Sequence, residues 1–339
     1  MNTHDMRGAV VRFCAAAGAD PLLVQGAGGN VSWKEGSSLW IKASGTWLGQ
    51  AADKDIFVPV ELDALRGAVD GGSFDVTPVV RGASELRPSI ETLLHALMPQ
   101  TVVVHLHAVE VLAHLVREDC AAEFESKLPA SLSWVCVPYR KPGADLARAV
   151  HEALAANDAN VVFLQNHGVV IGAESPAAVE AILDQLVTAL RTAPMPPLAG
   201  VLPPGPIEVD AAIFEPVADP NIQRLAFDAR LFARLASQWA LYPDHVVFLG
   251  AFPHVFDDLA ALEAALERAQ ENVELVFVRG VGVFATPGFT KAKQVQLRCY
   301  FDVLVRQSDT DRVTTLGASD IGELLNWDAE QYRMRLSKQ

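Results

Sequence analysis

Three histidines have the spacing of a metal site. His105 and His107 end the apolar run TVVVHLH, and His167 follows a second apolar run, NVVFLQN. Residues i and i+2 of a strand project from the same face of a sheet, so His105 and His107 can present two imidazole nitrogens to one ion. Three histidine ligands leave coordination positions open for water or substrate, as catalysis requires. Taken alone, an HxH pair with a distant histidine is more often a set of ordinary polar residues.

A carboxylate accompanies these histidines. Glu91 falls in the first turn of a helix that we expect over 89–98, after Pro88, with His95 one turn later on the same face. The helix dipole stabilises a carboxylate at this position, which is a purely structural reason for its presence. A general base at the cleft of the metal is the functional alternative. The spacing leaves both interpretations open.

Two glycine-containing segments could bind an anion. The run GAGGN over 26–30 is neither a dinucleotide-binding fingerprint nor a Walker loop, because the flanking strand–helix pattern and the GK[ST] ending are missing. Backbone N–H groups of such a run can still form an anion-binding nest. The segment ASGT over 43–46, which follows Lys42, adds hydroxyls. Ordinary turns are the alternative for both segments.

Alternating helix and strand patterns position these residues. We expect helices and strands interleaved along the first half of the chain, which predicts a layered α/β domain. The pattern alone is compatible with a parallel, doubly wound sheet as well as with a mixed one. The expected helices cover 5–18, 89–98, 144–157 and 175–192, the last with Ser175 as N-cap and Pro176 at its first position, and the expected strands cover 38–43, 101–107 and 160–166.

A proline-rich segment divides the chain. Residues 194–206 contain six prolines and two glycines, which cannot continue a helix or a central strand. We expect it to link a domain over 1–193 to a smaller α/β region over 207–339. Within that region VELVFVRGVGVFATPGFTKAKQV is similar to NVVFLQNHGVVIGAESPAAVEAI, and we place Val281 at the position of His167. This similarity suggests a degenerate duplication that lacks the metal ligand.

Charge, hydropathy and cysteine spacing limit the kinds of partner and the compartment that we expect for this protein. The chain of 339 residues has a formal net charge of −14 and no basic stripe, so we expect neither nucleic acid nor an anionic membrane surface as a partner. No apolar stretch approaches the roughly 20 residues of a membrane span, and the first residues do not resemble a signal peptide. Cys14, Cys120, Cys136 and Cys299 lie far apart, as free thiols in a reducing cytoplasm would. The sequence favours a cytoplasmic protein that acts on a small molecule.

The order of these segments resembles that of the class II aldolase/adducin family. GAGGN, KASG, PSIE with a histidine four residues later, HLH, VPY and NHG follow one another over about residues 5–190. The amino-acid sequences of these motifs are most similar to a subgroup that resembles rhamnulose-phosphate aldolases and the aldolase part of aldolase/short-chain dehydrogenase fusions. The resemblance implies a three-layer α/β/α domain around a mixed, largely antiparallel sheet. It also implies a homo-oligomer, either a tetramer or a dimer.

The same resemblance implies roles for individual residues. Glu91 matches the family's acidic base, and Tyr139, in CVPYRKPG, matches a loop tyrosine that donates a proton, often across a subunit boundary. The histidines would ligate Zn²⁺, or another divalent transition metal, and a further set would hold the phosphate of the substrate. The metal ligands are His105, His107 and His167; the phosphate-binding positions are Gly28, Asn30, Ser44, Gly45 and Ser89.

The resemblance implies a zinc-dependent aldolase that cleaves or forms a carbon–carbon bond in a small keto-sugar phosphate through a metal-stabilised enediolate. The same chemistry serves epimerases, dehydratases and decarboxylases of the family, and these alternatives stay open. A non-catalytic, adducin-like binding protein is the alternative from another class. Ile90 stands where many members have a second serine. Phosphate recognition would then depend on a cation, or the pocket would select a carboxylate; the available cations are Lys42, Arg81 and Arg87.

Overall fold

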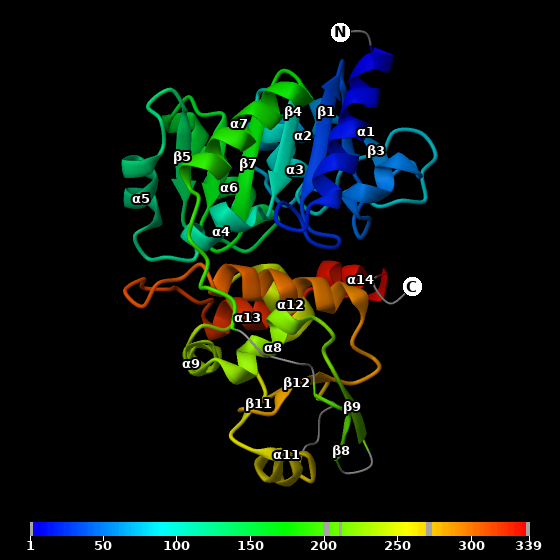
Figure 1. Ribbon diagram of the computed structural model, residues 1–339. Helices are drawn as coiled ribbons and strands as arrows, with labels where there is room; N and C mark the ends of the chain where they lie inside the picture. Colours follow the sequence, from blue (N-terminus) through cyan, green and yellow to red (C-terminus); the bar gives the residue numbers. More distant parts are fainter. Residues whose placement is uncertain (1–2, 199–203, 210–211, 269–272, 337–339) are drawn as a thin grey trace. The chain divides into compact units, whose positions relative to one another are not determined.

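The computed structural model describes residues 3–198, 204–209, 212–268 and 273–336, which form two compact units (Figure 1). The first unit runs to Arg191 and includes the closing segment from Asn326, and the second spans Thr192–Leu325. None of the described helices is long and apolar enough to cross a membrane. All four cysteines are free thiols.

A seven-stranded sheet organises the first unit, in the order β3-β2-β1-β4-β7-β6-β5 (Figure 1). Every neighbouring pair is antiparallel except β5 and β6, which are parallel. The expectation of a mixed, largely antiparallel sheet is confirmed, and the doubly wound parallel alternative is wrong. The strands are β1 (Asn30–Glu35), β2 (Ser38–Lys42), β3 (Phe57–Glu61), β4 (Val102–Leu106), β5 (Trp134–Val137), β6 (Val161–Leu164) and β7 (Gly168–Ala173).

Helices cover both faces of this sheet, which confirms the α/β/α layering. Helices α1, α4 and α7 pack together in one layer, while α2, α3 and α6 pack together in the other. Alternate residues of β4 belong to different layers: Val103 joins the core beneath α3 and α6, and its two neighbours point the other way. The helices are α1 (Thr3–Ala19), α2 (Leu62–Asp70), α3 (Thr92–Leu97), α4 (Val109–Leu115), α5 (Cys120–Lys127), α6 (Ala144–Ala156), α7 (Pro176–Ala189) and α14 (Asp328–Leu336), with a 3₁₀ turn over Leu48–Ala52.

The helix ends test the local predictions. Ser175 caps α7 as expected, since its side chain accepts a hydrogen bond from the Ala178 N–H with Pro176 at the first position. The expected start of the helix over 89–98 is wrong, because α3 begins only at Thr92 and Glu91 is its N-cap residue. Pro88 pairs as an isolated antiparallel bridge with Ala43. Because this pairing keeps the chain extended at Pro88, the helix begins later than expected.

The second unit is a smaller α/β layer arrangement, as expected. Its five-stranded sheet has the order β10-β11-β12-β9-β8, with β10 and β11 parallel and the other pairs antiparallel. Residues 199–203 of the proline-rich segment lie outside the described residues. The elements are β8 (Ile207–Val209), β9 (Ala212–Pro216), α8 (Pro220–Phe227), α9 (Ala229–Ser237), α10 (Pro243–Leu249), β10 (Val255–Phe256), α11 (Leu259–Leu266), β11 (Leu275–Val278), β12 (Gly282–Ala285), α12 (Lys291–Leu304) and α13 (Ala318–Leu325).

Candidate metal centre

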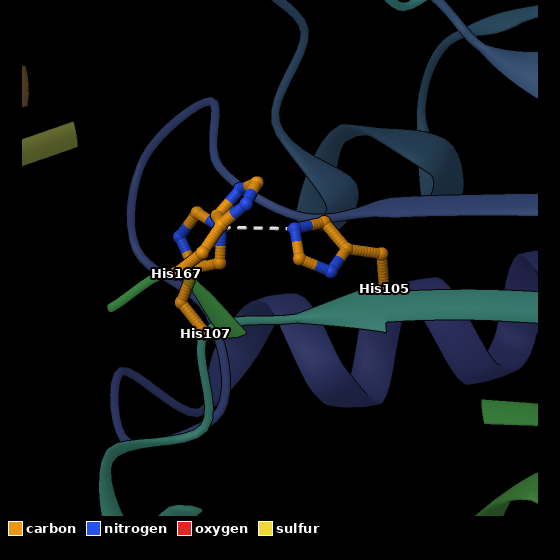
Figure 2. Close-up of side chains that lie close together, drawn as sticks. All are labelled: His105, His107 and His167. Atoms are coloured by element: carbon orange, nitrogen blue, oxygen red, sulfur yellow. Dashed lines mark hydrogen bonds between the residues drawn. The ribbon is translucent and has the colours of Figure 1, made fainter. Parts of the chain in front are cut away.

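The three histidines singled out in the sequence lie together in the first unit (Figure 2). His105 belongs to β4, His107 follows its end, and His167 stands in the turn between β6 and β7. Antiparallel pairing sets His105 opposite Val170, so the end of β4 lies beside the start of β7. One ligand nitrogen from each ring lies within 4.8 Å of those of the other two, and all three side chains are buried.

Hydrogen bonding orients the first of these rings. The Nδ1 of His105 lies 3.1 Å from the backbone oxygen of Val169, which can only accept, so Nδ1 carries the proton. The lone pair of His105 Nε2 then points at His107, whose Nε2 is 3.1 Å away (Figure 2). A backbone carbonyl that fixes the tautomer in this way is typical support for a metal-ligating histidine.

Close packing around the rings requires glycine at two positions. A Cβ on Gly168 would lie 2.6 Å from the backbone oxygen of Leu106 and within about 3 Å of ring carbons of His105 and His107. A Cβ on Gly29 would lie 2.9 Å from the backbone oxygen of His105, and the φ of Gly29 is +65°. The glycines of NHG and GAGGN therefore let two backbone segments approach the histidines closely.

Glu91 lies against the histidine cluster. Its Oε1 is 3.4 Å from His167 Nε2, and its Oε2 is 3.7 Å from His105 Nε2. Asn30 donates a hydrogen bond of 2.7 Å from Nδ2 to Oε2 of this carboxylate. Burial raises the pKa of Glu91, but the surrounding imidazoles, led by His105 and His167, lower it more, so the pKa falls to about 2. The carboxylate is therefore ionised, and it faces the same point as the ligand nitrogens.

A second buried polar pair joins β1 to α3. Ser32 and His95 are joined by a contact of 2.8 Å between Oγ and Nδ1, and both side chains are fully buried. Burial is the main cause that lowers the pKa of His95 to about 3, so its ring is neutral. Ser32 was not singled out from the sequence. Its signal was the strand period, since it follows Asn30 by two residues and shares its face of β1.

Three of the expected phosphate-binding residues take part in hydrogen bonds within the protein. The Ser89 hydroxyl accepts a hydrogen bond from the Glu91 N–H, and the Ser44 N–H donates to the backbone oxygen of Arg87. The N–H of Gly28 donates to the backbone oxygen of Gln25. The amides of Gly28 and Ser44 are thus engaged within the protein, so an anion nest built from these two amides is not present.

Among the cationic side chains Lys42, Arg81 and Arg87, it is Lys42 that connects the two glycine-containing loops through hydrogen bonds. Lys42 is 1% exposed, and its Nζ donates to the backbone oxygens of Ala27 and Thr46, at 3.1 and 2.6 Å. Arg81 instead pairs with Glu61 on β3. The Arg87 guanidinium stacks on the ring of Tyr332 in α14, 4.4 Å from its centroid. Helix α14 also approaches Gly45 closely through Leu336. A Cβ on Gly45 would lie 2.4 Å from Leu336 Cδ1.

Tyr139 stands at the same edge of the sheet as His167. Val137, the last residue of β5, pairs in parallel with Leu164 of β6, and the Gln165 N–H donates to the Val137 oxygen. The loop of Tyr139 and the turn of His167 therefore leave neighbouring strands side by side. His114 lies on α4 and contacts Glu123 and the backbone oxygen of Leu190.

Comparison with known proteins bears on the same part of the chain. The family model described as "Class II Aldolase and Adducin N-terminal domain" matches residues 9–193. The uncharacterized oxidoreductase YuxG of Bacillus subtilis (strain 168) is 29% identical over 178 residues, which are 47% of this chain and 25% of YuxG. The chain thus spans about a quarter of the length of this curated relative.

Two solved structures are similar to part of the chain. The N-terminal class II aldolase domain of a conserved protein from Thermoplasma acidophilum is 26% identical, with a TM-score of 0.46, and the match covers 56% of this chain and 93% of that one. YgbL from Klebsiella pneumoniae, described as a putative aldolase/epimerase/decarboxylase, is 20% identical with a TM-score of 0.41, and the match covers 56% of this chain and 89% of that one.

Proposed function

The chain belongs to the class II aldolase and adducin family, and on this premise we propose that it is a divalent-metal aldolase. It would cleave or form a carbon–carbon bond in a small keto-sugar phosphate. The observation that carries the proposal is the convergence of three buried imidazoles and one ionised carboxylate on a single point. A purely structural metal site would more often be closed by a fourth protein ligand.

The residues of the cluster fit a divalent transition metal. Neutral imidazole nitrogens suit zinc, and His105, His107 and His167 would hold the ion with positions left for substrate. When bound, the ion supplies a Lewis acid that polarises a carbonyl and stabilises the negative charge of an enediolate. Zn²⁺ is our choice of metal, on the strength of this donor set.

The remaining chemistry comes from the side chains. Glu91 is ionised beside the ligand nitrogens and is oriented by Asn30, so it can take up or return a proton at the reacting carbon. We assign to Tyr139 the proton on the aldehyde-side oxygen, since its loop leaves the sheet next to the turn of His167. Asn30, Ser44, Gly45, Ser89 and the loop of Gly28 would hold the phosphate end of the substrate.

We also propose a homo-oligomer in the cytoplasm. The resemblance implies that the loop tyrosine matched by Tyr139 often acts across a subunit boundary, and such a shared site needs at least a dimer. The free thiols fit a reducing compartment.

Metal analysis of the purified protein tests the proposal. We expect about one zinc per chain, and turnover of ketose phosphates that is lost on chelation and restored by metal. His107→Ala should lose both metal and turnover, whereas His254→Ala, at an exposed position, should retain both. A His107→Ala variant with full activity would sink the assignment. Failure of the unmodified protein to bind metal would favour the non-catalytic, adducin-like alternative.

Product analysis separates the related reactions. Aldol cleavage yields two carbonyl fragments from one substrate, epimerisation conserves mass, dehydration releases water and decarboxylation releases carbon dioxide. Detection of any of the last three without carbonyl fragments would replace the aldolase by an epimerase, dehydratase or decarboxylase of the same family.

A further inference from the structure

We propose that the second unit is a degenerate copy of the metal-binding half of the first, in which Pro216, Ala218 and Val281 occupy the three ligand positions. The copy keeps the backbone framework of the metal centre without its donor atoms. It is therefore a latent metal site that histidines at these positions would restore. The identity of the ligand positions rests on the proposed metal site; the correspondence of the two frameworks does not.

The two sheets have the same topology. Read from one edge, the first unit contains β5-β6-β7-β4-β1, and the second consists of β10-β11-β12-β9-β8. In each set only the first two strands are parallel, and the other three pairs are antiparallel. The strands also follow the same order along the chain, so each strand has one counterpart. A helix follows the last strand in both units, α7 in one and α12 in the other.

The turn that carries His167 recurs in the second unit with the same hydrogen bond. The His167 N–H donates to the Leu164 oxygen at 3.1 Å, and the Val281 N–H donates to the Val278 oxygen at 3.0 Å. The residue before each has a positive φ, 51° at Asn166 and 66° at Gly280. Asn166 adopts a φ that is uncommon outside glycine, and a glycine with the same sign of φ stands at its counterpart position.

Contacts between distant elements recur as well. The Asn166 N–H reaches the Leu115 oxygen, the last residue of α4, and the Gly280 N–H reaches the Ala226 oxygen, near the end of α8. Further along, the bond from Gly172 to Asn160 has its counterpart between Thr286 and Glu274; both run from N–H to backbone oxygen, at 2.8 and 2.9 Å. A common origin explains these matched bonds better than chance does, because each depends on a separate pair of segments.

Strand register identifies the other two ligand positions. His105 pairs with Val170 in the first unit, and Phe284, the counterpart of Val170, pairs with Pro216 in the second. Pro216 therefore stands at the position of His105, and Ala218, two residues later, at that of His107. The bond from the Val217 N–H to the Val283 oxygen fits this register.

The three counterpart positions carry no side chain that could hold a metal. Pro, Ala and Val side chains offer no donor atom, and within the described ranges the one cluster of three metal-ligating residues is that of the first unit. The long segment between β1 and β4 that carries Glu91 also has no counterpart, because only two residues separate β8 from β9. Val281 instead packs against an apolar core that includes Phe284, so packing replaces coordination in the copy.

Transplanted histidines test the proposal by metal binding alone. The background is a chain with His105→Ala, His107→Ala and His167→Ala, which removes the original cluster. Adding Pro216→His, Ala218→His and Val281→His should restore binding of about one Co²⁺ per chain, with the visible absorption of a low-coordinate ion. The Tm of this variant should rise when Co²⁺ is present. The matched control carries Glu215→His, Val217→His and Val281→His, which place two histidines on the opposite face of β9, and should not do so.

The outcomes are separable. If the unmodified protein binds metal and the folded transplant does not, this proposal is overturned while the proposed function stands. If the unmodified protein binds none, the proposed function and the ligand positions fall together. Should Pro216→His prevent folding, Ala218→His with Val281→His in the same background should still bind Ni²⁺ more tightly than Val217→His with Val281→His. Equal affinity of these two pairs would contradict the copy.

Discussion

Asn30 and Glu91, separated by 61 residues in sequence, are joined by a buried hydrogen bond of 2.7 Å from Nδ2 to Oε2. The bond exists because β1 pairs with β4 in a register that sets Asn30 opposite His105. A residue of the glycine-rich loop thereby holds the carboxylate beside the ligand nitrogens. Asn30, expected to bind phosphate, is thus first of all a positioning residue for Glu91.

Asn30→Ala should lower turnover by about 10–100-fold and weaken metal binding, because loss of such a supporting hydrogen bond commonly has this effect. Steady-state kinetics with parallel metal titration would measure both. Asn157→Ala, at the exposed end of α6, is the matched control and should leave both unchanged. Unaltered kinetics in Asn30→Ala would show that Glu91 needs no such support.

Glu91→Gln should separate metal binding from proton transfer. The amide has nearly the shape of the carboxylate but no basicity, so turnover should fall by about 10²–10⁴-fold while the three histidines still hold metal. Elemental analysis and kinetics on one preparation provide the comparison, with Glu180→Gln at an exposed position of α7 as control. Retention of near-normal turnover would remove Glu91 from the role of base.

Gly168→Ala should weaken metal binding without touching a ligand atom. The added methyl would meet the Leu106 backbone oxygen at 2.6 Å and the two neighbouring imidazoles, so the histidines must shift at a cost of roughly 1–3 kcal/mol. Competition with a coloured chelator measures the loss. Gly67→Ala, in α2, meets nothing within 4 Å and should instead stabilise the fold by about 0.5–1 kcal/mol. Equal metal affinity in Gly168→Ala and the unmodified protein would contradict the packing argument.

The second unit should lose stability in acid through His245. This histidine of α10 is fully buried, with its ring centroid 4.3 Å from that of Trp239 and 4.6 Å from that of Tyr300, and burial lowers its pKa to about 3. Below pH of about 6.5 the unfolded chain binds a proton that the folded chain excludes. The free energy of unfolding should therefore fall as the pH falls from about 6.5 towards 3, by up to about 1.4 kcal/mol per pH unit.

Urea denaturation across this pH range, with His245→Phe compared to the unmodified chain, tests this contribution. The variant should show a shallower fall in the free energy of unfolding, because phenylalanine takes up no proton. His254→Phe, at an exposed position, should keep the original slope. Identical slopes in all three proteins would mean that His245 is protonated in the folded chain.

Several features of the site could be predicted because they depend on local periodicity or on segment order. His105 and His107 share a face because a strand alternates, and Ser175 caps α7 because its hydroxyl and Pro176 act within one turn. The layered α/β class followed from interleaved patterns. The mixed sheet did not follow from them, and it rested on the resemblance.

Other features depend on partners distant in sequence. The start of α3 was misplaced because Pro88 pairs with Ala43, which no local pattern reveals. The amide of Ser44 likewise donates to the backbone oxygen of Arg87, a partner that no local pattern reveals.

By itself the sequence determined which residue types were available and which of them shared a strand face, since both are properties of a single segment. Only the tertiary structure decided that Glu91, Asn30 and His167 meet His105, because the register between β1, β4 and β7 is a property of the assembled sheet. The same holds for the second unit, where one aligned segment hinted at a copy. Strand pairing alone assigned Pro216 and Ala218 to the positions of His105 and His107, because neither residue has a metal-ligating side chain by which the sequence could reveal the correspondence.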